Sequence, residues 1–211
     1  MKLPKWTTAI PVAAVVAVAG LVVAPATSQA ASSVSSAQAQ PAGLSDSDLA
    51  KLPLTKRDLS RQERINLATV LGAYHAAEGN VDDPAAFINS YTEDGFFNSI
   101  LANQTYRGAA LGDVVTRTAA MFPDVHRDLR SISVNGDTIS IQLHIQGTFE
   151  GPLQTPAGVL KPTGAKVDYP TDDFFYLRNG KIREFDCLIG FSAEMSQLGV
   201  DFDWATAVGK N

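Results

Sequence analysis

The stretch VDYPTDDFFYLRNGKIREFD, Val167–Asp186, is the most informative part of this sequence because it predicts two paired strands. Apolar and polar residues alternate on both sides of Asn179-Gly180, and an Asn-Gly pair between two such runs is typical of a type I′ hairpin turn. The alternation places six residues of the first strand on one face: Val167, Tyr169, Thr171, Asp173, Phe175 and Leu177. Asp173 is the only acid on this largely apolar face, so its position needs a chemical or a structural explanation.

The second strand of this hairpin is expected to bring further acids to the same face. Continued alternation after the turn predicts that four residues point inward: Ile182, Glu184, Asp186 and Leu188. Two neighbouring carboxyl groups can share one proton, which gives them different roles in acid/base chemistry. Pairing with Lys181 or Arg183 at the rim of the sheet is the structural alternative, and a register error of one residue would reverse the faces.

A second hairpin is predicted just before this one. Arg130–Phe149 alternates around Asn135-Gly136, which also suits a type I′ turn. Its inner face is expected to carry Ile139, Ile141, Leu143, Ile145 and Phe149, and its outer face Ser140, Gln142, His144, Gln146 and Thr148. The outer face is polar and flat.

Helices are predicted on both sides of the strands. Ser60 and Glu63 have the spacing of a capping box, so a helix should begin there. Asp83-Pro84 suits the start of a second helix, with Tyr91 on its apolar side, and a third helix should end at Pro123. A short helix, SAEMSQLG, follows the last strand. Helices first and an antiparallel meander afterwards indicate an α+β fold.

The N-terminal residues have the layout of a secretory signal peptide. Two lysines precede an apolar run of 15 residues, Ala9–Val23, and a segment of small residues ends at Ala30. We expect cleavage near residue 30 and a secreted or extracytoplasmic protein; a retained anchor is the alternative, although a spanning helix needs ~20 residues. Residues 31–57 are expected to form a disordered linker, and residues 58–205 the single folded domain.

Composition excludes several classes of partner. Without the two lysines of the first 30 residues, 15 basic and 22 acidic residues remain, a net charge of −7. An acidic protein is a poor match for nucleic acid and for anionic membrane surfaces. Cys187 is the only cysteine, so it forms no intrachain disulfide, and the three histidines show no metal-ligand spacing. No phosphate-binding or dinucleotide-binding motif occurs, so we expect neither a metal nor another cofactor.

Several pieces of the chain, taken in order, resemble the SnoaL-like polyketide cyclase family (ester cyclase type) of the nuclear-transport-factor-2-like superfamily. They are AYHAAEGNVDDPAAFINSYTEDGFF, FPDVHRDLRSISVNGDTISI, GTFEG, KPTGAKVDYPTDDFFYLRNGKIREF and QLG, and they span about residues 64–200. The resemblance implies a cone-shaped barrel in which a curved antiparallel sheet wraps three helices around an apolar pocket. It also implies that Asp173, seven residues before Gly180, is the inward acid/base residue. The resemblance further implies that a homodimer forms through the polar outer face of the Arg130–Phe149 hairpin.

Other residues are candidates for the same pocket. Asp186 is expected to be a second catalytic acid, and six residues are expected to bind substrate: Asn98, Tyr74, Phe149, Tyr169, Phe175 and Glu184. For two of them there is a structural alternative, because Asn98 could simply end a strand and Tyr74 could pack in the core. Many members of the family have His where this chain has Phe149. Asp173 among apolar residues should have a raised pKa, because low polarity disfavours its charged form. A carboxylate held by backbone N–H groups is the structural alternative.

Two functions from different classes remain open at the level of sequence. The first is a secreted, cofactor-free enzyme that acts on a small hydrophobic carbonyl or polyketide-like compound through Asp173. The second is a secreted module that binds a small hydrophobic ligand or mediates dimerisation without catalysis. A pocket filled by Phe149, Tyr169 and Phe175 would favour a module whose pocket is vestigial.

Overall fold

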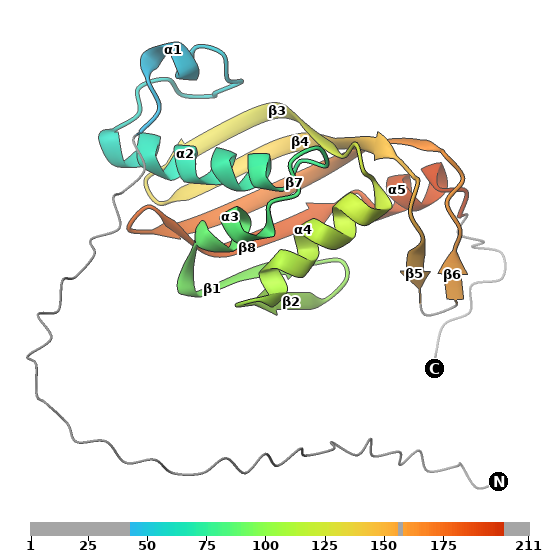
Figure 1. Ribbon diagram of the computed structural model, residues 1–211. Helices are drawn as coiled ribbons and strands as arrows, with labels where there is room; N and C mark the ends of the chain where they lie inside the picture. The colour runs from blue at the N-terminus through green and yellow to red at the C-terminus, as the bar shows by residue number, and fades with distance from the viewer. Residues whose placement is uncertain (1–42, 156–157, 201–211) are drawn as a thin grey trace, which may run out of the picture. The chain divides into compact units, whose positions relative to one another are not determined.

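The computed structural model describes residues 43–155 and 158–200, which form an α+β unit around one curved sheet (Figure 1). The main sheet has the strand order β2-β1-β8-β7-β4-β3. Its strands are β1 (Tyr91–Ser99), β2 (Gln104–Arg107), β3 (His126–Asn135), β4 (Thr138–Thr148), β7 (Lys166–Arg178) and β8 (Lys181–Ile189). A separate pair, β5 (Leu153–Thr155) and β6 (Gly158–Leu160), forms a small two-stranded sheet.

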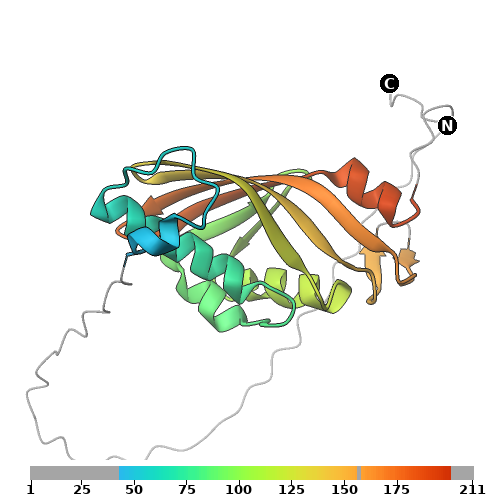
Figure 2. The ribbon, with the colours of Figure 1, turned by 90° about the horizontal axis from the view of Figure 1, so that it is seen from above.

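The described residues form five helices, three of which cover the concave face of the curved sheet (Figure 2). They are α1 (Asp46–Leu49), α2 (Arg61–Ala76), α3 (Pro84–Asn89), α4 (Ala110–Met121) and α5 (Phe191–Gln197). Helices α2, α3 and α4 lie on the concave side, and α5 packs beside β7. The predicted α+β class is confirmed. The expected closure into a barrel is not found in the described part of the chain, because β2 and β3 are the two edges of the sheet.

Both long hairpins, β3–β4 and β7–β8, have two-residue loops that contain a glycine, but only the second loop lies where the sequence predicts it. Asn179 and Gly180 have φ values of 53° and 75°, and two positive φ values are what a type I′ turn requires. In the other hairpin Asn135 pairs with Thr138, so the loop is Gly136-Asp137 and only Gly136 has a positive φ. The type I′ turn expected at Asn135-Gly136 is therefore wrong in position, by one residue, and in turn type, because type I′ needs two positive φ values.

The predicted helix starts are confirmed by their caps. The Ser60 side chain accepts a hydrogen bond from the Glu63 amide, and the Glu63 carboxylate accepts one from the Ser60 amide at 2.7 Å. Asp83 caps α3, whose first residue is Pro84. Helix α3 ends at Asn89, so Tyr91, expected on this helix, instead begins β1.

The linker predicted up to residue 57 is too long. Leu49 is buried, the Thr55 amide donates to the Ile132 carbonyl at 2.9 Å, and Leu54 forms a parallel bridge with Ile132. Apolar residues in this segment thus add to the core beside β3, where a polar composition suggested a disordered chain. The predicted signal peptide, residues 31–42 of the linker and residues 201–205 of the domain lie outside the described residues.

Candidate active site

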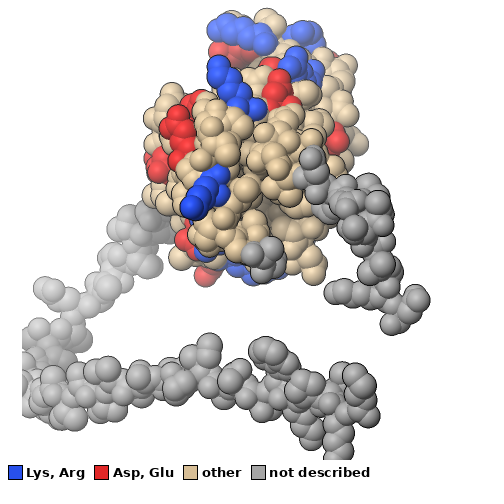
Figure 3. Space-filling model, turned by 90° about the vertical axis from the view of Figure 1, so that its right-hand side faces the viewer, with Lys and Arg blue, Asp and Glu red and all other residues tan. Residues whose placement is uncertain are grey.

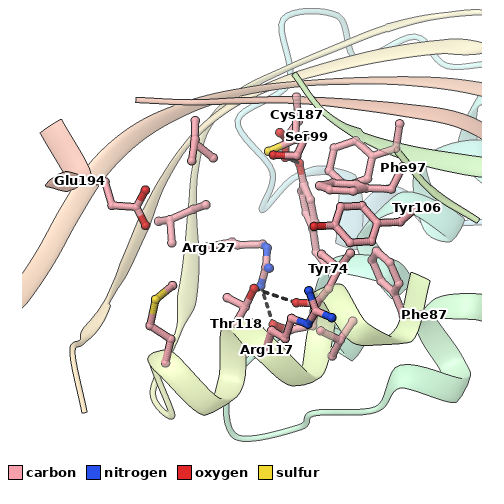
Figure 4. A pocket seen from close by; sticks show the side chains of 18 of the residues that line it. Tyr74, Phe87, Phe97, Ser99, Tyr106, Arg117, Thr118, Arg127, Cys187 and Glu194 are labelled. Carbon is pink, nitrogen blue, oxygen red and sulfur yellow. Dashed lines mark hydrogen bonds between the residues drawn. The ribbon is translucent and has the colours of Figure 1, made fainter. Parts of the chain in front are cut away.

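A cavity of about 220 Å³ lies between the concave face of the sheet and helices α2, α3 and α4 (Figure 4). Its walls are mainly aromatic and aliphatic, with a few polar groups at fixed places. The polar and aromatic lining includes Tyr74, Phe87, Phe97, Tyr106, Thr118, Arg127, Tyr169, Asp173, Phe185, Cys187 and Glu194. Figure 3 shows the face at the α5 end of this unit, whose middle consists mostly of uncharged residues. A largely apolar cavity with a few polar groups is the usual form of a small-molecule site.

Asp173 is held in the cavity wall by β7 and contacts α2 through Tyr74. The residue is 3% exposed, and the Tyr74 hydroxyl donates to its Oδ2 at 2.6 Å. Its other oxygen, Oδ1, is buried and has no hydrogen-bond partner among the described residues. The Cys187 thiol faces Asp173 from β8, but a thiol is a weak donor and does not satisfy Oδ1. The structure therefore leaves one buried carboxylate oxygen of Asp173 without a partner in the described part of the chain.

Burial changes the acidity of Asp173. Desolvation raises the pKa of this carboxyl from 3.8 to about 6, while the hydrogen bond from Tyr74, the Cys187 thiol and the charge of Arg127 partly oppose the rise. The predicted direction of the pKa change is confirmed. A carboxylate with a pKa near 6 is a stronger base than an ordinary aspartate and is still mostly ionised at neutral pH, which suits proton transfer.

Arg127, which the sequence did not single out, brings a positive charge into the same cavity. Its Nη1 donates to the Ala77 carbonyl at 2.7 Å and contacts Glu78 Oε1 at 3.4 Å, and both side chains of this ion pair are mostly buried. The guanidinium also lies 5.6 Å from the centre of the Tyr74 ring. A guanidinium has five N–H donors, so these bonds leave donors that can face a ligand oxygen. In Figure 4, Arg127 extends into the middle of the cavity.

Glu194 is a second buried acid of this cavity and was also missed by the sequence. It lies on α5 and is 5% exposed; desolvation raises the pKa of its carboxyl from 4.5 to about 7, and the Tyr169 hydroxyl partly opposes this rise. A helix of seven residues has too few turns for apolar periodicity to show which side faces inward. No signal in the sequence could therefore have distinguished Glu194 from a surface glutamate.

The predicted inward positions of Glu184 and Asp186 are wrong because β8 contains a bulge. Leu177 pairs with Ile182 but Tyr176 pairs with Glu184, so one extra residue shifts the alternation. Phe185 and Cys187 consequently face the cavity, whereas Glu184 and Asp186 lie outside its lining.

Asn98 shares this outer position with Asp186. The Asn98 Nδ2 donates to Asp186 Oδ1 at 2.7 Å, and Thr105 donates to the Asn98 oxygen at the same distance. The two residues are cross-strand neighbours of β1 and β8. Phe97 on one side of Asn98 and Ser99 on the other line the cavity instead. The hydrogen bonds of Asn98 and Asp186 thus join strands, and the side chains do not reach a ligand in the cavity.

The predicted aromatic residues divide between cavity and core. Tyr74 and Tyr169 line the cavity, as expected. Phe175 is fully buried and stacks on Phe185 with ring centres 4.1 Å apart, and Phe149 packs 6.0 Å from Phe122. Neither Phe149 nor Phe175 lines the cavity, so they do not fill it and they do not contact a ligand in it.

The described residues contain no group of three or more His, Cys, Asp and Glu side chains that could hold a metal ion. Within the same part of the chain, no helix is long and apolar enough to cross a membrane.

The chemistry that this cavity itself offers is acid/base chemistry by Asp173 and Glu194, with hydrogen bonds from Tyr74 and Arg127.

Comparison with known proteins shows the same fold in several bacterial proteins. A protein classed as a SnoaL-like polyketide cyclase from Jannaschia sp. CCS1 is 23% identical, with a TM-score of 0.58 over 68% of this chain and 98% of that one. AclR, assigned as a hydroxylase of Streptomyces galilaeus, is 20% identical, with a TM-score of 0.54 over 64% and 95% of the two chains.

A protein from Catenulispora acidiphila DSM 44928 with a ketosteroid isomerase-like fold, in complex with trimethylamine, is 22% identical, with a TM-score of 0.53 over 64% and 95%. Among curated proteins none matches. The family model for the SnoaL-like polyketide cyclase matches residues 68–198, which is more than half of the sequence. This chain therefore belongs to the SnoaL-like polyketide cyclase family.

Proposed function

We propose that the protein binds a small hydrophobic carbonyl compound in this cavity and catalyses a cofactor-free acid/base reaction on it through Asp173. One observation carries the proposal: Asp173 is buried in the cavity wall with Oδ2 bound to Tyr74 and Oδ1 without a partner. A buried polar atom is costly unless it is satisfied, so an unsatisfied carboxylate oxygen in a cavity fits a group that exchanges protons with a ligand.

The size of the cavity limits the ligand. An apolar protein cavity of about 150 Å³ takes up benzene, so a cavity of about 220 Å³ fits one or two fused rings or an aliphatic compound of similar volume. The family name refers to polyketides, but a large polycyclic product would not fit entirely within this volume. We therefore propose a compact carbonyl compound as the substrate.

The positions of Asp173 and Arg127 suit proton removal next to a carbonyl group. In the proposed step, a C–H proton of the ligand passes to Asp173 Oδ1, and the electron pair of that bond moves into the carbonyl to give an enolate. The guanidinium of Arg127 stabilises the negative oxygen, because a positive charge in a low-dielectric site favours an anion strongly. Return of the proton to a different atom completes an isomerisation, and attack of the enolate on a second carbonyl completes a ring closure.

Substitution of Asp173 tests this proposal. Asp173→Asn is nearly isosteric and is expected to lower turnover of enolisable ketones, hydrophobic esters or epoxides by about 10²–10⁴, while the ligand still binds. Asp172→Asn is the matched control, because Asp172 is the neighbouring acid on the exposed face of β7. Full activity in Asp173→Asn would exclude Asp173 from the mechanism. Binding without turnover in the wild-type protein would instead favour the non-catalytic binding module.

Export and dimerisation belong to this proposal as well. The basic and apolar N-terminal pattern supports secretion, and sequencing of the exported protein should give a first residue near Ala31. The polar outer face supports a homodimer: His144 Nδ1 lies 2.6 Å from Asp168 Oδ1 on this face, and Gln142 is exposed between strands. Sedimentation at micromolar concentration should give twice the mass of one chain; a clean monomer would contradict the dimer.

A further inference from the structure

The proposed reaction uses one buried acid, yet the cavity holds two. Glu194 lines the same cavity as Asp173 but comes from α5 at the end of the domain. Its carboxyl lies beside the Tyr169 hydroxyl, so each acid of the cavity is accompanied by a tyrosine, Tyr74 in one case and Tyr169 in the other. In Figure 4, Glu194 points into the cavity from the side opposite to Phe97 and Tyr106.

The two acids are separated along β7. Tyr169 and Asp173 lie on the same face of this strand, four residues apart, and a strand rises ~3.3 Å per residue, so their Cα atoms are about 13 Å apart. The carboxyl group beside Tyr169 and the carboxyl group of Asp173 thus lie at two ends of one cavity. A pair of carboxyl groups that share a proton needs direct contact, so this arrangement suits two separate contacts with a ligand.

One polar group without a partner in the described part of the chain lies on the inward face of β7 between Tyr169 and Asp173. The Thr171 hydroxyl is buried on the same face of β7, midway between Tyr169 and Asp173, and has no hydrogen-bond partner in the described part of the chain. Arg127 acts electrostatically on Tyr74, Tyr169 and Asp173, which places its charge within reach of both ends. Apolar side chains such as Val115, Ile145 and Phe185 also line the cavity and can contact the rings of a ligand.

We propose that Glu194 is a second ligand-binding residue, and that the ligand is a compact apolar molecule of about two rings with an oxygen function at each end. One oxygen of the ligand contacts Asp173 and Arg127. The other oxygen forms a hydrogen bond with the carboxyl group of Glu194, either as donor or as acceptor. This inference rests on the proposed function, because it concerns the same cavity. It adds to that function the requirement for a second oxygen on the ligand, because an apolar end placed against the Glu194 carboxyl group would desolvate this group without giving it a further hydrogen bond.

Two naphthalene compounds test the requirement. 2-Naphthol has one hydroxyl, and 2,6-dihydroxynaphthalene has the same rings with hydroxyls at both ends; their binding can be followed by their own fluorescence. We expect the diol to bind about five- to tenfold more tightly than 2-naphthol to the wild-type protein, the effect of about one additional hydrogen bond. Glu194→Leu should remove this gain and leave the affinity for 2-naphthol unchanged.

Two further variants complete the test. Glu194→Gln keeps a side chain that forms hydrogen bonds and should retain most of the gain, which also covers the case in which Glu194→Leu does not fold. Glu150→Leu replaces an exposed glutamate outside the cavity and should bind both compounds as the wild type does. If the diol shows no gain, or if the gain survives in a folded Glu194→Leu protein, the role of Glu194 is wrong and the proposed function stands. If neither compound binds to the wild-type protein, the two-ring ligand with an oxygen at each end is wrong, whereas the proposed function is decided separately by the turnover of carbonyl compounds in Asp173→Asn.

Discussion

Replacement of Asp173 by Asn should stabilise the protein at alkaline pH and leave its stability nearly unchanged in acid. The carboxyl group has a pKa of 3.8 in an unfolded chain and about 6 in the folded protein. A group with a raised folded-state pKa contributes stability that is full below pH 4 and is lost as the pH rises through 6. Asn has the same shape but cannot ionise, so it does not lose this stability.

The size of the effect follows from the pKa shift. A change of about two pKa units corresponds to about 3 kcal/mol, because one unit is ~1.36 kcal/mol. At pH 8, Asp173→Asn should therefore raise the free energy of unfolding by up to about 3 kcal/mol. Below pH 4 the two proteins should differ by less than about 1 kcal/mol, because the Asn oxygen can still accept the hydrogen bond from Tyr74.

Urea unfolding followed by far-ultraviolet circular dichroism, at pH 4, 6 and 8, measures this difference directly. Glu194 also titrates in this range, but both proteins contain it, so its contribution cancels when the two are compared. Asp172→Asn should show at most a small pH-dependent gain, because its side chain is exposed and its charge is the weakest of the effects on the pKa of Asp173. A loss of 1–3 kcal/mol in Asp173→Asn at every pH would refute the reasoning, because it would identify Asp173 as a structural hydrogen-bond acceptor.

Three further predictions concern the fold and the cavity wall. Gly151→Ala should lower the free energy of unfolding by more than about 2 kcal/mol, because its new Cβ would lie 1.8 Å from the Ala120 carbonyl oxygen. Gly72→Ala has open space around its new Cβ and should instead stabilise helix α2 by up to about 1 kcal/mol; thermal unfolding of both variants measures the two effects. Glu63→Gln should lower the free energy of unfolding by about 1 kcal/mol at pH 7. Backbone hydrogen bonds lower the pKa of the Glu63 carboxyl from 4.5 to about 2, so the difference between the two proteins should disappear as the pH falls through this range. Equal stability of the two proteins at pH 7 would contradict this prediction. Cys187 should react with a thiol reagent at least a hundredfold more slowly in the folded protein than in urea, because burial raises the pKa of its thiol, and rapid labelling of the native protein would show that the cavity wall opens readily.

The sequence determined those features that depend on local chemistry. The turn at Asn179-Gly180 was predictable because few residues adopt two consecutive positive φ values, and the start of α2 was predictable because the capping box satisfies backbone groups only three residues apart. The inward position of Asp173 followed from strand alternation close to that turn. Its raised pKa then followed from its apolar neighbours.

Only the tertiary structure decided the composition of the site. Side chains of a strand alternate between two faces, so a single bulged residue in β8 reverses the side of every later position. Phe185 and Cys187 therefore line the cavity, where the sequence pattern predicted Glu184 and Asp186. Arg127 and Glu194 reach Asp173's cavity from β3 and α5, far from one another in the sequence. No local pattern marks such residues, since what brings them to one cavity is the packing of sheet and helices around a shared core.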